Sequence, residues 1–201
     1  MNHAPFPRAV IFDLDGTLAD SPLDFDAIRN EIGLRPGVPI LEQLADATDA
    51  ERARAEVIMR RHERRAIATA TLTDGCAELL AHLGTHAVPV GILTRNIREV
   101  VDTFARNFQF SFHAVYTRED GPPKPSPAGV LALCAKLGAA PHETLTVGDY
   151  KFDVLAGRNA GCRTVLYAPA PPHPEDLADW APDMVVRSLR ELLPLFPRSR
   201  D

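Results

Sequence analysis

The sequence predicts an α/β protein built on a parallel sheet, with a small helical domain inserted near its start. Short apolar runs, each long enough for a buried strand, alternate along most of the chain with segments whose apolar residues recur at helical spacing. Strands that alternate with helices pair in parallel, because each helix returns the chain to the same end of the sheet. In one interval near the N-terminus, helical patterns follow one another without an intervening strand, which indicates an insertion.

Six short apolar runs are the expected strands. The first run, Ala-Val-Ile-Phe at residues 9–12, is fully apolar, as expected for a buried strand. The last run is the weakest of the six. The expected strands are residues 9–12, 88–93, 114–116, 144–147, 163–167 and 184–186.

Helical patterns separate most of these runs. Residues 97–106 place their apolar side chains on one helix face. Ser126 can cap a helix that begins at Pro127 and ends at Gly138, because proline favours the first turn of a helix and glycine the position after its end. Residues 76–83 form the helix with which the chain returns to the sheet.

The interval from about Ala19 to Thr73 breaks this alternation. It contains helical patterns at residues 24–32, 40–45 and 50–68 and no convincing strand, and Asp74-Gly75 marks the return to the sheet. We therefore predict a core domain from residues 1–18 and 74–201 and a helical cap domain from residues 19–73. A lobe attached at this point can close over a site at the sheet edge.

Composition narrows the class of protein. The chain has 201 residues, 45% of them hydrophobic, and a net charge of -5. This charge argues against nucleic acid or an anionic membrane as a partner, because such surfaces attract concentrated lysine and arginine. The three cysteines form no Cys-x-x-Cys pair, and no apolar stretch approaches the length of a membrane span. We expect a cytoplasmic protein that functions as a monomer.

Two carboxylates follow the first expected strand. Asp13 and Asp15 should point the same way, with Leu14 turned to the core, because side chains alternate along a strand. Their repulsion is about 4 kcal/mol at a separation of about 4 Å. The pair therefore predicts either a bound cation or a shifted proton.

Other polar residues follow two further strands. Thr94-Arg95-Asn96 ends the second expected strand, and Gly148-Asp149, with Asp153 one helical turn later, ends the fourth. In a parallel sheet these ends lie on one edge, where open α/β sheets bind ligands. Asp149 and Asp153 can face the same side, although capping of the helix alone would also explain Asp153.

A lysine before a helix completes the pattern. Lys124 precedes Pro125 and is the only lysine between Met1 and Lys136. Beside a helix start it forms an anion site, although most lysines are solvated surface residues. The pattern combines carboxylates that can bind a metal, a lysine that can bind an anion and a carboxylate that can act as a nucleophile. Together these groups indicate phosphoryl transfer. Hard oxygen ligands favour Mg²⁺, and an aspartate can serve as the nucleophile.

Four motifs, in this order and spacing, resemble those of the haloacid dehalogenase-like hydrolase superfamily. They are Asp13-Leu-Asp15-Gly-Thr-Leu18, Ile92-Leu-Thr94-Arg-Asn96, Lys124-Pro-Ser-Pro127 and Gly148-Asp149-Tyr-Lys-Phe-Asp153. The resemblance spans residues 8–167, and the insertion is similar to the C1-type cap of the phosphoglycolate phosphatase-like branch. It implies a Rossmann-like, three-layer α/β core and a Mg²⁺-dependent phosphatase that acts on a small-molecule phosphate ester.

The resemblance also implies residue roles. Asp13 would be the nucleophile and Asp15 the general acid and base. Mg²⁺ would be held by Asp13, the Asp15 backbone carbonyl and Asp149, with Asp153 as their support. Thr94 and Lys124 would bind the phosphoryl group. The expected substrate-binding residues are Gly16, Thr17, Arg95, Asn96 and, in the cap, Arg64.

Several alternatives stay open at this point. Dehalogenase members of the superfamily lack the second acid, so Asp15 favours phosphate esters; phosphomutases of the same cap type keep both acids. The absence of lysine from the predicted cap disfavours phosphonate cleavage by a Schiff base. A phosphoacceptor signalling module also combines acids, threonine and lysine on a parallel sheet, but it carries no helical cap. A scaffold that binds a partner through its cap is the third reading.

The arginines at residues 60–65 have two interpretations. Arg64 and its neighbours can bind an anionic group of the substrate. They can equally form a solvated face or pair with Glu56 and Glu63 within the cap.

Overall fold

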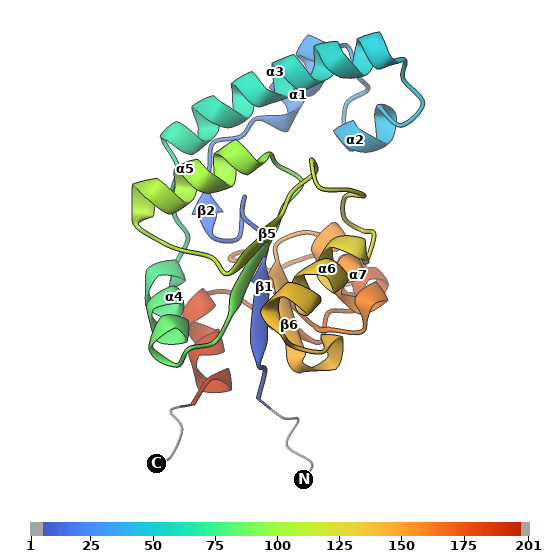
Figure 1. Ribbon diagram of the computed structural model, residues 1–201. Coiled ribbons are helices and arrows are strands. Elements are labelled where there is room, and N and C mark those ends of the chain that lie inside the picture. The colour runs from blue at the N-terminus through green and yellow to red at the C-terminus, as the bar shows by residue number, and fades with distance from the viewer. Residues whose placement is uncertain (1–5, 198–201) are drawn as a thin grey trace. The chain divides into compact units, whose positions relative to one another are not determined.

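The computed structural model describes residues 6–197. Its largest feature is a six-stranded sheet with the order β5-β4-β1-β6-β7-β8, in which every neighbouring pair is parallel (Figure 1). The strands are β1 (Ala9–Phe12), β4 (Val90–Leu93), β5 (Ala114–Tyr116), β6 (Thr144–Gly148), β7 (Arg163–Tyr167) and β8 (Met184–Val186). All six predicted strands are present, and the predicted α/β fold class is confirmed.

Strand β1 lies between β4 and β6 and is buried along its whole length. Phe12, its last residue, is in register with Ile92 of β4 and Val147 of β6. Because the three strands are parallel and end at nearly the same level, the residues that follow them lie on one edge of the sheet. This register places the first, second and fourth predicted motifs side by side.

Helices cover both faces of the sheet and form the outer layers. Helices α6 (Ala128–Leu137) and α7 (Lys151–Ala160) contact each other on one face, and α4 (Cys76–Thr85) contacts the C-terminal 3₁₀ helix η2 (Leu189–Leu195) on the other (Figure 1). The remaining elements of this part are α5 (Arg98–Phe108), η1 (Pro141–Glu143) and α8 (Pro174–Trp180).

Residues 21–70 form a second compact unit, distinct from residues 1–20 and 71–201. Its helices are α1 (Phe25–Ile32), α2 (Ile40–Gln43) and α3 (Asp49–Ala68), and α1 packs on α3 around a small apolar core that includes Ile28 and Met59. Thr48 caps α3 by accepting a hydrogen bond from the Glu51 amide, while the Glu51 carboxylate accepts one from the Thr48 amide.

Two short strands differ from the prediction. Strand β2 (Ala19–Asp20) pairs antiparallel with β3 (Thr71–Leu72) at the point where the chain leaves and re-enters the sheet unit. The sequence shows no convincing strand in residues 19–73, because strands of two residues are too short to show an alternating pattern. The predicted division into a core domain and a cap domain, and the role of the helical unit as a cap, stay predictions.

The three cysteines are buried and unpaired, as expected for small core residues. Burial raises the pKa of the Cys76 thiol to about 12. Among residues 6–197, every helix is too short or too polar to cross a lipid bilayer.

Candidate active site

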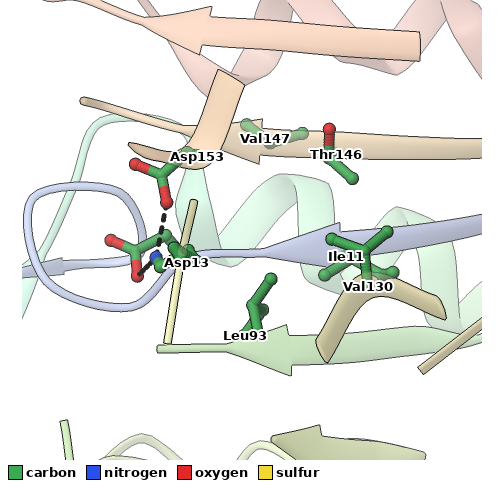
Figure 2. A pocket seen from close by; sticks show the side chains of 8 residues that line it. Ile11, Asp13, Leu93, Val130, Thr146, Val147 and Asp153 are labelled. Carbon is green, nitrogen blue, oxygen red and sulfur yellow. Dashed lines mark hydrogen bonds and ion pairs between the residues drawn. The ribbon is translucent and has the colours of Figure 1, made fainter. Parts of the chain in front are cut away.

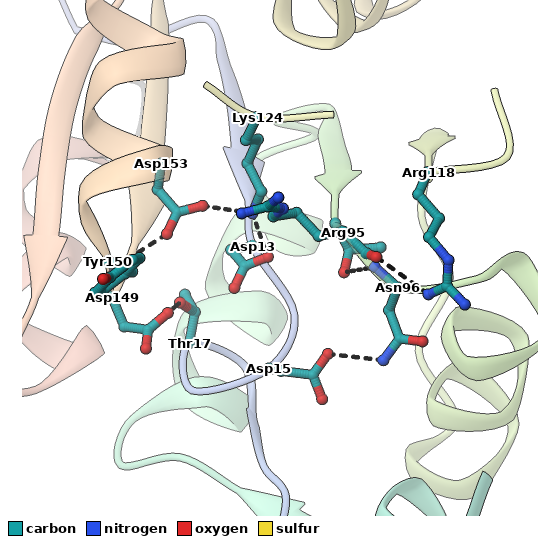
Figure 3. A network of polar contacts seen from close by, with 11 residues as sticks. Asp13, Asp15, Thr17, Arg95, Asn96, Arg118, Lys124, Asp149, Tyr150 and Asp153 are labelled. Carbon is teal, nitrogen blue, oxygen red and sulfur yellow. Dashed lines mark hydrogen bonds and ion pairs between the residues drawn. The ribbon is translucent and has the colours of Figure 1, made fainter. Parts of the chain in front are cut away.

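Asp13 and Lys124 form the centre of the site (Figure 3). Asp13 directly follows β1, and its carboxylate accepts a hydrogen bond from the Lys124 ammonium at 2.5 Å. The same ammonium also donates to the Asp153 carboxylate from the first turn of α7. The side chains of all three are at most a tenth exposed. Lys124, from the loop before α6, thus links a carboxylate that follows β1 to one in the first turn of α7.

The electrostatics of this centre leave room for a cation. Burial raises the pKa of Asp13 well above its usual value, and the Asp153 and Asp149 carboxylates add to the increase, whereas Lys124 opposes it. Burial alone would lower the pKa of Lys124, but the carboxylates of Asp13 and Asp153 raise it instead. Burial, together with Asp153, raises the pKa of Asp149 to about 7. One buried ammonium therefore does not neutralise the carboxylates around it.

Asp149 is positioned by the turn after β1. It follows β6, and its carboxylate accepts a hydrogen bond from the Thr17 hydroxyl at 3.3 Å. Gly16 lies against it with φ of +79°, and a Cβ there would lie 2.7 Å from the Asp149 carboxylate carbon. Gly16 and Thr17, both predicted to contact substrate, therefore shape the carboxylate cluster in this structure.

Three carboxylates lie close enough together to bind one hard cation. Oxygen atoms of Asp13, Asp149 and Asp153 lie within 4.8 Å of one another. Oxygen donors of this kind fit Mg²⁺. Within the cluster, Asp153 already uses both its oxygens, one for Lys124 and the other for the Tyr150 amide at 3.0 Å. This arrangement favours Asp153 as a support for the other groups.

Asp15 has different surroundings from Asp13. Its carboxylate accepts a hydrogen bond from the Asn96 side-chain amide at 3.0 Å, and the Asn96 side-chain oxygen accepts one from the Ile97 amide at 2.8 Å. The second bond fixes the orientation of the Asn96 amide group, so that its NH₂ faces Asp15. The Thr94 hydroxyl accepts a hydrogen bond from the backbone amide of Asn96 at 3.0 Å, which stabilises the turn after β4.

The floor of the site is apolar. Below Asp13, Lys124 and Asp153, a small pocket is lined by apolar side chains of β1, β4, β6 and α6 (Figure 2). These lining residues are Ile11, Leu93, Val130, Val147 and the partly polar Thr146. An apolar floor lowers the local dielectric, which strengthens the interaction of the charged groups above it.

The remaining predicted substrate residues divide between the two units. The guanidinium of Arg95 lies 4.4 Å from the centre of the Phe152 ring, and its backbone carbonyl accepts a hydrogen bond from Arg118. Arg64 belongs to α3 of the helical unit, and its substrate contact stays a prediction. Its neighbours Arg60 and Arg61 pair with Glu56 and Glu31 inside that unit.

Sequence reasoning missed two contributors beside the site. Phe152 supports Arg95, and Lys151 lies over the same ring. Both sit inside the fourth motif, between Asp149 and Asp153, so position in the motif was the available signal.

Comparison with known proteins agrees with this geometry. Residues 22–167 match the family described as haloacid dehalogenase-like hydrolase. An uncharacterized hydrolase of Saccharomyces cerevisiae is 35% identical over 166 residues, covering 79% of this chain and 76% of that protein. Two proteins of Pseudomonas aeruginosa are also similar. N-acetylmuramic acid 6-phosphate phosphatase is 28% identical over 96% of both chains, and phosphoglycolate phosphatase 1 is 27% identical over 94% of this chain and 79% of its own.

A solved structure shows the same fold. A hydrolase from Pseudomonas syringae superposes with a TM-score of 0.77 and 23% identity, covering 92% of this chain and 96% of that one.

Proposed function

This chain belongs to the haloacid dehalogenase-like hydrolases, and from that membership we propose that it is a Mg²⁺-dependent phosphatase acting on small-molecule phosphate monoesters. The predicted family is confirmed by the match over residues 22–167, and the chain is an enzyme of a hydrolase family whose related members include phosphatases. The metal, the covalent intermediate on Asp13 and the substrate class are the parts we propose.

The observation that carries the proposal is the burial of Asp13 against Lys124 beside two further carboxylates. Asp13, Asp149 and the Asp15 backbone carbonyl would hold Mg²⁺, with Asp153 supporting them through Lys124. When bound, the cation supplies positive charge that offsets the repulsion between the carboxylates and a phosphate dianion. The three-carboxylate cluster supports this assignment, because hard oxygen donors suit this cation.

The remaining chemistry follows from the chain's own residues. An oxygen of Asp13 attacks phosphorus, and the bond from phosphorus to the ester oxygen breaks, which leaves a phosphoryl group on Asp13. Lys124 and the Thr94 hydroxyl hold the other phosphoryl oxygens. Asp15 donates its proton to the departing alkoxide and then removes a proton from the water that attacks the phosphoryl group. Asp13 is thereby regenerated, and phosphate is released.

The surroundings of Asp15 suit these two roles. Its carboxylate accepts a hydrogen bond from the Asn96 side-chain amide, whereas Lys124 is bonded to Asp13 and Asp153. The small-molecule substrates named for two relatives support a substrate of similar size, and the cytoplasmic location stays a prediction.

Repeated turnover tests the proposal. With Mg²⁺ present, the protein should hydrolyse many equivalents of p-nitrophenyl phosphate, and Asp13→Asn should stop this. Asp102→Asn, on the exposed surface of α5, is the matched control and should leave the rate unchanged. A single stoichiometric phosphorylation of Asp13 without turnover would contradict a phosphatase and support a phosphoacceptor signalling module.

A further inference from the structure

Two of the three buried cysteines lie close together in the core of the sheet unit. Cys134 comes from α6, and Cys162 directly precedes β7. Both belong to the apolar cluster that the sheet forms with helices α6 and α7, and both are less than a tenth exposed. Cys76 lies in α4, which covers the other face of the sheet (Figure 1). Cys134 and Cys162 are therefore neighbours, and Cys76 is apart from them.

The strand register accounts for this proximity. In the ladder of β6 and β7, Leu145 pairs with Arg163. The residues before them, Thr144 and Cys162, therefore lie side by side where the two strands begin. Neighbouring strands are about 4.8 Å apart, and residues in register point to the same face of the sheet. The Cys134 thiol donates a hydrogen bond to the Thr144 hydroxyl at 3.5 Å, so it reaches the same place from α6.

The two thiols contact each other directly. The Cys162 thiol donates a hydrogen bond to the Cys134 sulfur, and this bond lowers the pKa of Cys134 while it raises the pKa of Cys162. Burial opposes the first change and adds to the second. The Thr144 hydroxyl, which accepts from Cys134, in turn donates to the Ala140 carbonyl at 2.9 Å. One sulfur that ionises readily thus lies against one that keeps its proton, and the thiolate is the form of cysteine that reacts.

We propose that Cys134 and Cys162 form a modification site, at which a small hydroperoxide converts the two adjacent thiols into a reversible disulfide. The Cys134 thiolate attacks one oxygen of the peroxide, the O–O bond breaks, and the sulfur is oxidised to a sulfenic acid as hydroxide leaves. The Cys162 sulfur then attacks the Cys134 sulfur and the S–O bond breaks. The hydroxyl group leaves as water with the proton of Cys162. Two thiols and one molecule of hydrogen peroxide thus give one disulfide and two molecules of water.

The disulfide joins α6 to the start of β7 and closes a ring of chain that contains β6 and α7. Asp149 and Asp153 lie within this ring. A cross-link stabilises a fold chiefly by restricting the unfolded chain, so oxidation stabilises the sheet unit. The inference goes beyond the proposed phosphatase function and does not depend on it.

Peptide mapping tests the linkage, because the three cysteines fall in different tryptic peptides. Cys76 lies in residues 66–95, Cys134 in residues 119–136 and Cys162 in residues 159–163. The folded protein is treated with hydrogen peroxide, and its remaining thiols are then blocked. Mass spectrometry should find residues 119–136 joined to residues 159–163, dithiothreitol should separate them, and Cys76 should be recovered as a blocked thiol. Absence of this linkage, or linkage of Cys76 as often, overturns the proposal.

Variants separate the pair from oxidation elsewhere. In Cys76→Ala, peroxide should raise the melting temperature by about 5–10 °C, as expected for closing a ring of this length, and dithiothreitol should reverse the rise. Cys162→Ala should show no such rise, and dimedone should instead capture a sulfenic acid at Cys134. An equal rise in Cys162→Ala overturns the stabilising disulfide.

Circular dichroism before oxidation shows whether each variant is folded. Should Cys162→Ala not fold, the peptide map of the wild type and of Cys76→Ala still decides the linkage. Turnover of p-nitrophenyl phosphate is measured separately. Its absence would contradict the proposed function and leave the result for the disulfide intact.

Discussion

The two carboxylates after β1 differ in their hydrogen-bond partners. Asp13 is bonded to the buried ammonium of Lys124 at 2.5 Å, and Asp15 to the neutral amide of Asn96 at 3.0 Å. The two acids, which are neighbours in the sequence, therefore contact different side chains in the structure.

Substitution of Asp15 should affect esters according to their leaving group. Asp15→Asn keeps the shape that Asn96 contacts but removes the transferable proton. We expect kcat/KM to fall by about 10²- to 10⁴-fold for alkyl phosphates, the usual contribution of general acid catalysis. The loss should be smaller for p-nitrophenyl phosphate, whose leaving group needs no proton. Rates for a series of esters of graded leaving-group pKa check this, and equal losses across the series would exclude Asp15 as the acid.

Gly16 should be needed for the carboxylate cluster. In Gly16→Ala the added Cβ would collide with Asp149 and push its carboxylate away from Asp13. We expect the Mg²⁺ concentration for half-maximal activity to rise by about tenfold or more, since misplacing one ligand weakens a metal site by roughly that factor.

The matched control for Gly16 is Gly161. It also has a left-handed backbone, with φ of +81°, but a Cβ there meets nothing within 4 Å. Gly161→Ala should cost about 1–2 kcal/mol of backbone strain and leave the Mg²⁺ dependence unchanged. If both variants shift the Mg²⁺ dependence equally, strain and not the collision with Asp149 is the cause.

Helix α3 depends on its capping box for a defined start. Thr48→Ala removes the hydroxyl that accepts a hydrogen bond from the Glu51 amide. We expect this substitution to lower the free energy of unfolding by about 1 kcal/mol. Thr103→Ala is the control and should change stability less, because the Thr103 hydroxyl contacts only groups within its own helix, the Glu99 carbonyl and the exposed Arg106 guanidinium, and caps no helix end. Urea unfolding measured on both variants checks the difference.

The capping box also predicts a pH dependence. Hydrogen bonds from the Thr48 hydroxyl and amide lower the pKa of Glu51 below 4.5. A carboxylate with a depressed pKa in the folded state stabilises the fold above its unfolded pKa, and that contribution disappears as the pH falls through the folded value. The stability difference between wild type and Thr48→Ala should therefore narrow below about pH 4.5. A difference that grows on acidification would contradict the assignment.

Elements with a strong local pattern were predictable from the sequence, and those formed by distant contacts were not. The strand at Ala9–Phe12 is fully apolar, and α6 has Ser126 before it and Gly138 after it. Strands β2 and β3 consist of two residues each and exist because Ala19 and Leu72 meet across about fifty residues of intervening chain. The contact between Arg95 and the Phe152 ring was equally hidden, because the two residues come from different motifs.

Among the site residues, the types were predictable but the contacts were not. Asp13, Lys124 and Asp153 were recognisable as acids and a cation that follow strands or precede helices, since parallel strand ends share one edge. That one ammonium binds both carboxylates, and that Asn96 turns its amide toward Asp15, depends on side-chain directions that no local pattern encodes.

At the scale of the whole molecule, the chain divides into a unit that carries the proposed chemistry and a unit that does not. Asp13, Asp15, Thr94, Lys124 and Asp149 all belong to the unit formed by residues 1–20 and 71–201. Residues 21–70 have an apolar core of their own. The two crossings between the units are adjacent, because Asp20 pairs with Thr71 in the ladder of β2 and β3.

This arrangement predicts that the helical unit can be removed without loss of the chemistry. Joining Asp20 to Thr71 through Asn-Gly, which favours a tight hairpin between antiparallel strands, replaces residues 21–70. We expect the shortened protein to unfold cooperatively and to turn over p-nitrophenyl phosphate with Mg²⁺. Its kcat/KM values for different metabolite esters should converge, because the predicted cap would no longer select among them.

Thermal unfolding and steady-state rates over a panel of esters measure both effects, and Asp13→Asn in the shortened protein should remove the remaining turnover. A shortened protein that keeps the full-length order of substrate preference would show that residues 21–70, Arg64 included, do not select the substrate. Selectivity would then have to lie on the sheet unit. Loss of cooperative unfolding would instead show that the sheet unit needs the helical unit to fold.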